Sequence, residues 1–290
     1  MKRNDFIKSA GILIASSMID LKSFGNSVLE NENSYRMPAF FIGHGNPMNA
    51  LYDNPFTKAL SKSVIGIPTP KAILVVSAHW QTKGTYVTSM LAPKTIHDFG
   101  GFPKELFAVE YPALGSPEFA KQVIQQVKST TVQDDHDWGL DHGAWTVLKH
   151  MYPKADIPVF QMSLDYAKSA QWHYDLAKEL NALRSKGLLI VGSGNIVHNL
   201  GRVSWDDPNV KYDWSVEFDE KVKSDLIKRD HTDLINYEKI GKSALLSVPT
   251  NEHYLPMLYA AALQQKNEEV NFVYEGIEMG SISMRCFKIA

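Results

Sequence analysis

The 290-residue sequence contains only one cysteine, Cys286. A single cysteine cannot form an intramolecular disulfide, and it cannot supply the several thiolates that a cysteine-based zinc motif requires. Any metal site in this chain must therefore use histidine, aspartate, glutamate or water as ligands. Cys286 itself falls in a predicted terminal strand, where we expect a small buried side chain.

The sequence also has almost no excess of either charge and no apolar run long enough to span a bilayer. It contains 30 Lys+Arg against 32 Asp+Glu, a formal net charge of -2, and no long basic run. These absences argue against a nucleic-acid partner, an anionic membrane surface and stable membrane insertion. The hydrophobic fraction of 44% is that of an ordinary globular chain with a sizeable core.

Residues 1–35 are predicted to be an export-signal-like segment followed by a linker. A basic start that includes Lys2-Arg3 precedes a mildly apolar stretch at 9–19, an order typical of an export signal. The basic pair resembles a twin-arginine signal in which one arginine is a lysine. Residues 20–35 are polar and predict the linker. We therefore expect export to the periplasm by a Tat-like route, with a cytoplasmic protein carrying a frayed helix as the alternative.

Residues 36–290 have the pattern of an α/β fold, a single domain with a mostly parallel central sheet flanked by helices. Short apolar runs bounded by Gly or Pro predict buried strands, and such runs are typical of a parallel sheet covered on both faces. Segments of helical pattern alternate with them. The predicted strands are 39–42, 72–77, 158–164 and 187–191, with closing strands at 272–274 and 281–285 that can pair antiparallel at an edge. The predicted helices are 116–129, 140–151, 167–185, 215–229 and 252–266.

Three of the ten histidines follow predicted strands. His44 and His79 come after the first two apolar runs, and His198 follows a glycine-containing stretch after the fourth. Ligands of open α/β sheets bind outside the carboxyl ends of the strands, so these three imidazoles can converge on one point. His142 and His253 lie at the starts of predicted helices and can face the same site. The glycines at 192 and 194 are interpreted as permitting a tight turn, and Asp141 as a candidate helix cap.

The other five histidines have ordinary structural interpretations. His150, His173 and His231 lie in or beside charge-bearing helical segments and are predicted to be solvated. His136 lies in an acidic stretch and is predicted to be a loop residue. The glycine-rich, aromatic segment 97–103 is interpreted as a lid or a pocket wall.

Six motifs occur in chain order and together carry a family resemblance. They are Phe41–Pro47, Ser77–Trp80, His97–Pro103, Asp141–Trp145, Gly192–Leu200 and Glu252–Pro256. In combination they resemble the 4,5-DOPA extradiol dioxygenase-like branch of the class III, LigB-type, ring-cleavage dioxygenases. The resemblance covers the chain from about residue 37 to the C-terminus. It implies a single α/β domain, a mononuclear non-haem metal, a catechol-type substrate and O2.

The resemblance also implies roles for individual histidines. The positions of His44, His79, His198 and His253 match the metal-site histidines of this branch. His198 matches in addition an acid/base residue of better-known superfamily members, so both roles stay open. His142 matches a pocket residue that is a candidate second acid/base or substrate-binding group. An all-histidine set differs from the two-histidine, one-carboxylate iron site of other members, and it suits Zn2+ at least as well as Fe2+.

Three functions remain open on this basis. The first is a metal-dependent extradiol dioxygenase that uses O2 to open a catechol-type, DOPA-like aromatic ring. The second is a zinc-dependent hydrolase, in which the same histidines hold an ion that activates water. The third is an exported metal-binding protein without turnover. The sequence leaves monomer and homodimer equally open.

Overall fold

The computed structural model describes residues 35–290, of which the chain from Met37 onward forms one compact unit. Residues 1–34, which hold almost all of the predicted export-signal-like segment and linker, lie outside the described residues. No helix within residues 35–290 is both long and apolar enough to cross a membrane.

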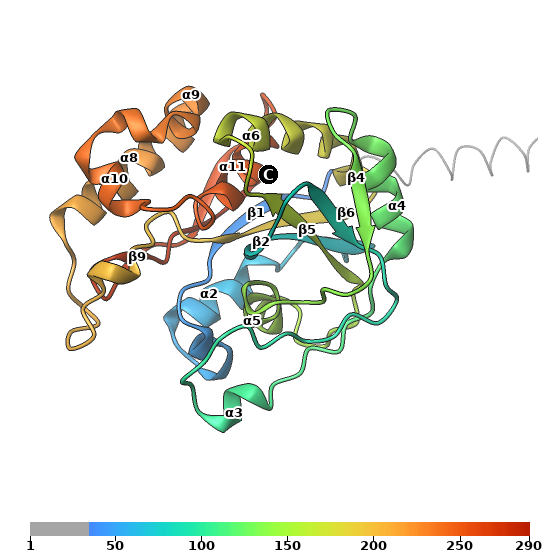
Figure 1. Cartoon of the computed structure of the whole chain (residues 1–290), viewed down its shortest axis with the longest axis horizontal. Coiled ribbons are helices and arrows are strands. Elements are labelled where there is room, and N and C mark those ends of the chain that lie inside the picture. The colour runs from blue at the N-terminus through green and yellow to red at the C-terminus, as the bar shows by residue number, and fades with distance from the viewer. Residues whose placement is uncertain (1–34) are drawn as a thin grey trace, which may run out of the picture. The chain divides into compact units, whose positions relative to one another are not determined.

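The core of the unit is an eight-stranded mixed sheet (Figure 1). Its strands are β1 (Ala39–Gly43), β2 (Ala72–Thr82), β3 (Thr85–Thr88), β4 (Val132–Asp135), β5 (Val159–Asp165), β6 (Leu188–Gly194), β7 (Val270–Tyr274) and β10 (Cys286–Ile289). The order across the sheet is β4-β3-β5-β2-β6-β1-β10-β7. The four central strands, β5, β2, β6 and β1, are parallel, whereas β10 and β7 continue the sheet antiparallel. At the other edge, β3 pairs antiparallel with β5 and parallel with β4.

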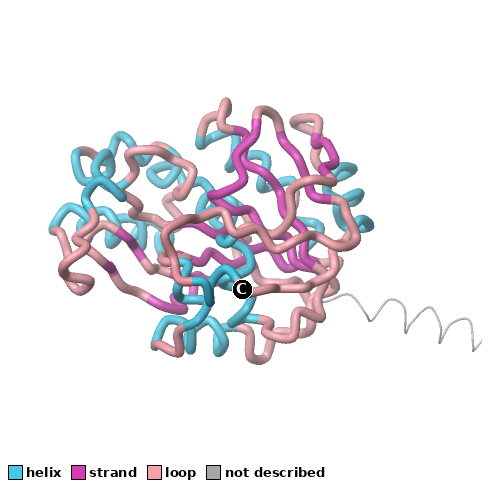
Figure 2. Tube along the Cα trace, turned by 60° about the horizontal axis from the view of Figure 1, so that its bottom comes forward, coloured by secondary structure: helices cyan, strands magenta, loops and turns pink. Residues whose placement is uncertain are grey.

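Helices cover both faces of this sheet. Apolar side chains of α4, α6 and α11 pack on one face, and those of α2 and α5 on the other. Figure 2 shows the strands inside the molecule with helices around them. The helices are α2 (Pro55–Ser63), α3 (Lys104–Phe107), α4 (Pro117–Gln126), α5 (His142–Met151), α6 (Ala170–Glu179), α7 (Asn181–Arg184), α8 (Asp213–Lys228), α9 (His231–Ile235), α10 (Lys242–Ser247) and α11 (Leu255–Ala262), with 3-10 turns at Pro47–Leu51, Leu200–Arg202 and Tyr237–Ile240. The predicted fold class, a mostly parallel sheet flanked by helices, is confirmed.

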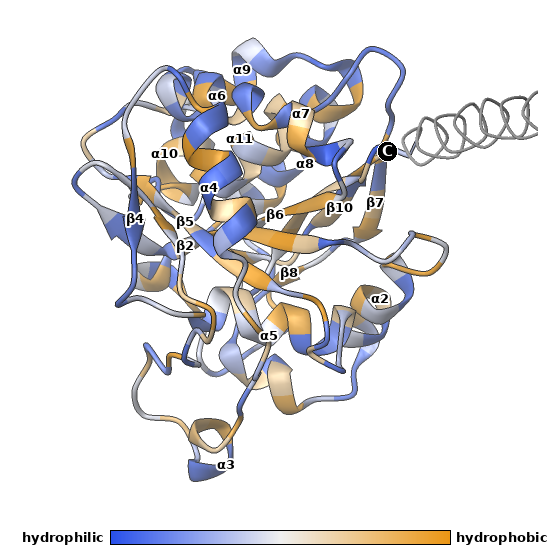
Figure 3. Cartoon of the chain, turned by 90° about the vertical axis from the view of Figure 1, so that its right-hand side faces the viewer, coloured by the Kyte–Doolittle hydropathy of each residue, from blue (hydrophilic) through white to orange (hydrophobic). Residues whose placement is uncertain are grey.

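The central strands are apolar because both of their faces are buried. In β2, Leu74 and Val76 pack into the core on one face, while Ile73 and Val75 pack into the core on the other. Successive strand residues point to opposite faces, so a strand covered twice needs an unbroken apolar run. Figure 3 shows these strands as hydrophobic segments between helices of mixed hydropathy. This requirement explains why the four predicted central strands are confirmed.

The end of the chain matches the prediction in part: the strand predicted at 272–274 is confirmed as β7, which pairs antiparallel at the edge of the sheet. The predicted strand at 281–285 is wrong, because only Ile282–Ser283 is extended there, as β9, and it pairs with β8 (Ile277–Glu278) in a separate hairpin. The amide of Ser283 donates to the carbonyl of Val197 instead of joining the main sheet. The main-sheet strand at this end is β10, which contains Cys286. That cysteine is fully buried, as predicted.

The prediction that His173 is solvated is also wrong. Its ring is fully buried, with Nδ1 3.0 Å from the hydroxyl of Tyr259 and Nε2 3.1 Å from the carbonyl oxygen of Asp165. The reason is helical periodicity, since Leu176 and Ala177 share its face of α6 and are buried with it. His150 and His231, predicted to be solvated too, are half-buried.

Other local predictions are confirmed. His136 is an exposed loop residue. Ser116 caps α4 by accepting a hydrogen bond from the amide of Phe119. The predicted helix at 167–185 is present as two consecutive helices, α6 and α7.

Candidate active site

Five histidines from separate parts of the chain line one pocket of about 510 Å3. His44 follows β1, His79 lies within β2, His142 is the first residue of α5, His198 lies after β6, and His253 comes just before α11. The carboxyl ends of parallel strands open at one edge of a sheet, which is why strand-end residues so distant in sequence meet here.

His79 is predicted to follow a strand, but in the structure it lies inside β2. Strand β2 does not end before this residue but runs on to Thr82. Between Val76 and Gln81, however, β2 leaves its regular pairing with β5. His79 therefore lies in an irregular stretch, and a break in the pairing is a common way to redirect a side chain next to a functional site.

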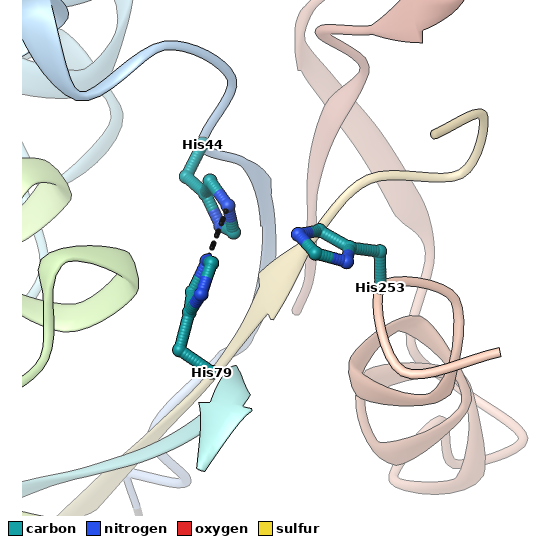
Figure 4. Close-up of side chains that lie close together, drawn as sticks. All are labelled: His44, His79 and His253. Carbon is teal, nitrogen blue, oxygen red and sulfur yellow. Dashed lines mark hydrogen bonds between the residues drawn. The ribbon is translucent and has the colours of Figure 1, made fainter. Parts of the chain in front are cut away.

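His44, His79 and His253 each present one ring nitrogen to a common point, and these three atoms lie within 4.8 Å of one another (Figure 4). The Nε2 atoms of His44 and His79 are 3.1 Å apart. Two nitrogens bound to one tetrahedral ion at about 2.0–2.1 Å lie about 3.3 Å from each other. The observed spacing is close to that value, so the donor set fits a single divalent metal ion.

Each of these three imidazoles has an oxygen atom of its own near Nδ1. The pairs are His44 with Ser193 Oγ at 3.0 Å, His79 with Asp98 Oδ2 at 3.4 Å, and His253 with Glu252 Oε1 at 3.1 Å. A hydrogen on Nδ1 leaves the Nε2 lone pair free. Metal-binding histidines typically have this arrangement, in which an outer oxygen orients the ring and fixes the tautomer.

Burial keeps these rings uncharged. It lowers the pKa of His44 and of His253 well below the usual range, and nearby imidazoles lower both further. The pKa of His79 falls to about 3, mainly through burial and then through His142, against an opposing effect of Asp98. Metal ions bind the neutral imidazole, so the cluster is in the binding form at neutral pH.

His198 is held differently from the other three predicted ligands. Its ring stacks on that of His253, with ring centroids 3.5 Å apart and planes at 7°. The lone pair of an imidazole nitrogen lies in the plane of its ring. Because the two ring planes are nearly parallel, the lone pairs of His198 and His253 do not point toward one nearby position. In this arrangement His198 and His253 do not aim at one common ion. The ligand role of His198 stays a prediction, whereas a role in proton transfer requires no rotation of the ring.

His142 is positioned by Asp98, a residue that the sequence analysis did not single out. Asp98 Oδ2 lies 3.0 Å from Nδ1 of His142, and Asp98 Oδ1 accepts a hydrogen bond from the amide of His142. Burial alone would raise the pKa of Asp98, but its interactions with His142 and His79 outweigh burial and lower it. Asp141 caps α5 by accepting from the amide of Ala144, as predicted. The carboxylate of Asp98 thus connects two of the five histidines.

Three residues that contact the histidines are not predicted as site residues from the sequence, although each lies within one of the six motifs. Asp98 follows His97 in the predicted lid or pocket wall, Glu252 precedes His253, and Ser193 lies inside the glycine-containing stretch. Segment 97–103 does form a pocket wall, through Gly100, Gly101 and Phe102. His97 is not among the pocket residues, and its Nε2 donates instead to the carbonyl of Val109.

The role assigned to Gly192 and Gly194 needs correction. Neither has a positive φ, so they are not needed for a tight turn. A Cβ at Gly192 would lie 2.1 Å from the carbonyl oxygen of Pro256, and a Cβ at Gly194 would lie 2.1 Å from that of His253. These glycines let β6 approach the segment that begins α11, and that approach brings His253 to the site.

A histidine cluster at the carboxyl ends of parallel strands, beside an open pocket, defines a metal-dependent enzyme of the α/β class. Residues 38–284 match the model of the catalytic LigB subunit of aromatic ring-opening dioxygenase, and the chain belongs to this LigB family.

Similar proteins agree with this assignment. A 4,5-DOPA dioxygenase extradiol from Escherichia coli K12 is 47% identical over 89% of this chain and 96% of its own length. The protein of the same name from Beta vulgaris is 34% identical over 86% of this chain and 95% of its own. The crystal structure of an uncharacterized protein from Escherichia coli K12 superposes with a TM-score of 0.77 at 43% identity, covering 88% of this chain and all of the other.

Proposed function

We propose that this protein is an extradiol dioxygenase that uses O2 to open the ring of a DOPA-type catechol, with one Fe2+ ion held by His44, His79 and His253. The observation that carries the proposal is the convergence of one ring nitrogen from each of His44, His79 and His253 at the wall of a pocket, each ring having an oxygen near its Nδ1. Membership of the LigB family supports the reaction. The names of the bacterial and plant relatives support the DOPA-type substrate.

The choice of Fe2+ over Zn2+ follows from the reaction. Three imidazoles suit either ion. When bound, Fe2+ would supply the redox chemistry that ring opening by O2 requires, whereas Zn2+ undergoes no redox change.

His142 and His198 are proposed to handle the protons of the catechol hydroxyls. Asp98 faces Nδ1 of His142, which leaves Nε2 of that ring to accept a proton. His198 is stacked on His253, and burial lowers its pKa to about 4. Both rings line the pocket. A neutral imidazole within reach of a bound hydroxyl is a suitable general base.

The pocket walls are proposed to orient the aromatic ring. Phe102, Leu200, Val203 and Ile282 provide apolar surface around the histidines. A volume of about 510 Å3 is typical of small-molecule sites. Apolar walls hold a flat ring in one orientation and displace water from the reacting atoms.

The test combines metal analysis with oxygen consumption. The protein is freed of metal, loaded under reducing conditions with Fe2+ or Zn2+, and supplied with catechols that include DOPA. We expect O2 uptake and a yellow ring-opened product with Fe2+ only, and neither in His44→Ala or His253→Ala. No O2 uptake across a catechol panel with Fe2+ present would refute the proposal. Esterase or amidase activity of the zinc form would identify a hydrolase, and tight metal without turnover would identify a binding protein.

A further inference from the structure

The pocket contains one carboxylate that the proposed chemistry does not use, that of Glu278. Its side chain is half-buried, and within residues 35–290 no hydrogen bond or ion pair engages it. The residues that line this pocket include no lysine and no arginine. The pocket therefore offers a substrate one fixed negative charge and no fixed positive charge apart from the metal.

Strand pairing places Glu278 near the histidine cluster, on the face of the β8–β9 hairpin that lines the pocket. Glu278 in β8 pairs with Ile282 in β9, and Ile282 forms a bridge with His198. Residues directly opposite one another on paired strands point to the same face, and all three line the pocket. Since neighbouring strands lie about 4.8 Å apart, the Cα atoms of Glu278 and His198 are about 10 Å apart. A catechol ring with a short side chain spans a distance of this order.

The hairpin that carries Glu278 is anchored and not a free tip. The amide of Met279 donates to the carbonyl of Pro208, and the amide of Ser204 donates to the carbonyl of Met279. These bonds attach the hairpin to the loop that also supplies Trp205 to the pocket. Glu278 is thus held at a defined place in the wall.

An unpaired, half-buried carboxylate is stabilised when a cation enters beside it. Burial raises the pKa of Glu278, because the charged form is less well hydrated in the pocket wall. Trp205, whose ring is largely exposed, lines the same pocket, and an indole face attracts ammonium groups. A carboxylate on the substrate would instead meet a like charge with no lysine or arginine of the lining to compensate it.

We propose that Glu278 is a specificity-determining residue that selects catechols bearing a protonated amine on the side chain over catechols bearing only a carboxylate. The proposal rests on the proposed function, because it names the substrate class of that same site. An amino-acid catechol would be recognised through its ammonium group.

The kinetic test compares three catechols whose short side chains differ in charge. They are dopamine (cationic), 4-methylcatechol (neutral) and 3,4-dihydroxyphenylacetate (anionic). We expect kcat/KM to decrease in that order for the Fe2+-loaded protein. In Glu278→Gln, the ratio of kcat/KM for dopamine to that for 4-methylcatechol should fall about tenfold or more, as expected for a lost charge-assisted hydrogen bond. In Glu278→Lys the order of dopamine and the anionic catechol should reverse.

The control is Asp206→Asn, which removes one exposed negative charge from the same loop region without changing a pocket residue. It should leave the substrate ratios unchanged within twofold. If Asp206→Asn and Glu278→Gln lower the ratio equally, the effect is a general one of net charge and the inference is overturned. Unaltered ratios in Glu278→Gln also overturn it.

A binding measurement separates this inference from the proposed function. Calorimetry with 2-phenylethylamine and phenylacetate, which lack the catechol hydroxyls, reports recognition without ring opening. We expect the amine to bind more tightly and to lose about tenfold in affinity in Glu278→Gln. Should no catechol be opened while this amine binding persists, the proposed function fails and the ammonium site stands. Equal binding of both probes, unaffected by the substitution, overturns the inference even if catechols are opened.

Discussion

Ser193 determines which nitrogen of His44 faces the metal site. Its Oγ lies 3.0 Å from Nδ1 of His44 and donates to the carbonyl oxygen of Gly143 at 2.5 Å. A hydroxyl has one hydrogen, and a carbonyl oxygen can only accept, so Oγ must act as acceptor toward His44. The hydrogen of His44 is therefore on Nδ1, and Nε2 presents its lone pair toward Nε2 of His79.

Removing this hydroxyl should weaken metal binding without unfolding the protein. In Ser193→Ala, Nδ1 of His44 loses its acceptor, and the tautomer that presents Nε2 is no longer favoured. We expect metal affinity to fall about 10–100-fold, measured by competition with a chelator. Ser243→Ala, at a buried serine that bonds Glu217 away from the site, is the matched control. Equal affinity in both variants would show that Ser193 has no such role.

Asp98 should matter for both metal binding and turnover, because it faces Nδ1 of His79 and of His142. Asp98→Asn keeps the shape but removes the charge that favours the Nδ1-protonated rings. We expect kcat for catechol opening to fall about 10–100-fold, together with weaker metal binding. The exposed Asp137 provides the control Asp137→Asn. A change in KM alone would assign Asp98 to substrate binding instead.

The stacked geometry predicts that His198 can be replaced with retention of the metal. In His198→Gln we expect about one metal ion per chain, as in the wild type, but a kcat lowered by a factor of about 100 or more, as for loss of a general base. His253→Ala should lose the ion. Metal content by elemental analysis decides the matter, since loss of metal from His198→Gln would make His198 a ligand.

The close approach at Gly194 predicts a large loss of stability on adding a methyl group. A Cβ there would lie 2.1 Å from the backbone oxygen of His253, and backbone cannot yield as a flexible side chain does. We expect Gly194→Ala to lower the free energy of unfolding by about 1–3 kcal/mol or more. Gly100→Ala, where nothing lies within 4 Å, should change it little. Thermal unfolding of the two variants tests this directly, and similar Tm values would contradict it.

Buried His173 predicts that acid weakens the fold. Burial lowers the pKa of His173 to about 4, against an opposing hydrogen bond to Asp165. In the unfolded chain the group titrates near pH 6.5, so below that pH the unfolded state binds a proton that the folded state does not. Stability contributed by neutral His173 is thus present above about pH 6.5 and is lost as pH falls toward 4, at up to about 1.4 kcal/mol per pH unit.

The variant His173→Gln isolates this contribution. Denaturant unfolding between pH 4.5 and 7.5 should show a shallower decline for the variant than for the wild type. The site histidines affect both proteins equally and cancel in the difference. Parallel curves for the two proteins would contradict the assignment.

Much of the fold could be predicted from sequence because it depends on local pattern. The apolar runs at β1, β2, β5 and β6 are needed wherever a strand is covered on both faces, so they identify the central sheet without coordinates. His44 and His79 follow from the same rule, since residues at the carboxyl ends of parallel strands share one edge. The short strands β3 and β4 were missed because a run of only four residues carries too little periodicity to be recognised.

Sequence alone therefore determined the class of fold and the histidines that could share a site. Tertiary structure decided which nitrogen His44 and His79 present, because Ser193 and Asp98 orient these rings through contacts that no local pattern encodes. It also decided that His198 stacks on His253 and that Glu278 enters the pocket. Such contacts depend on side-chain direction and on pairings across 80 residues or so of chain, and only the packed fold specifies these.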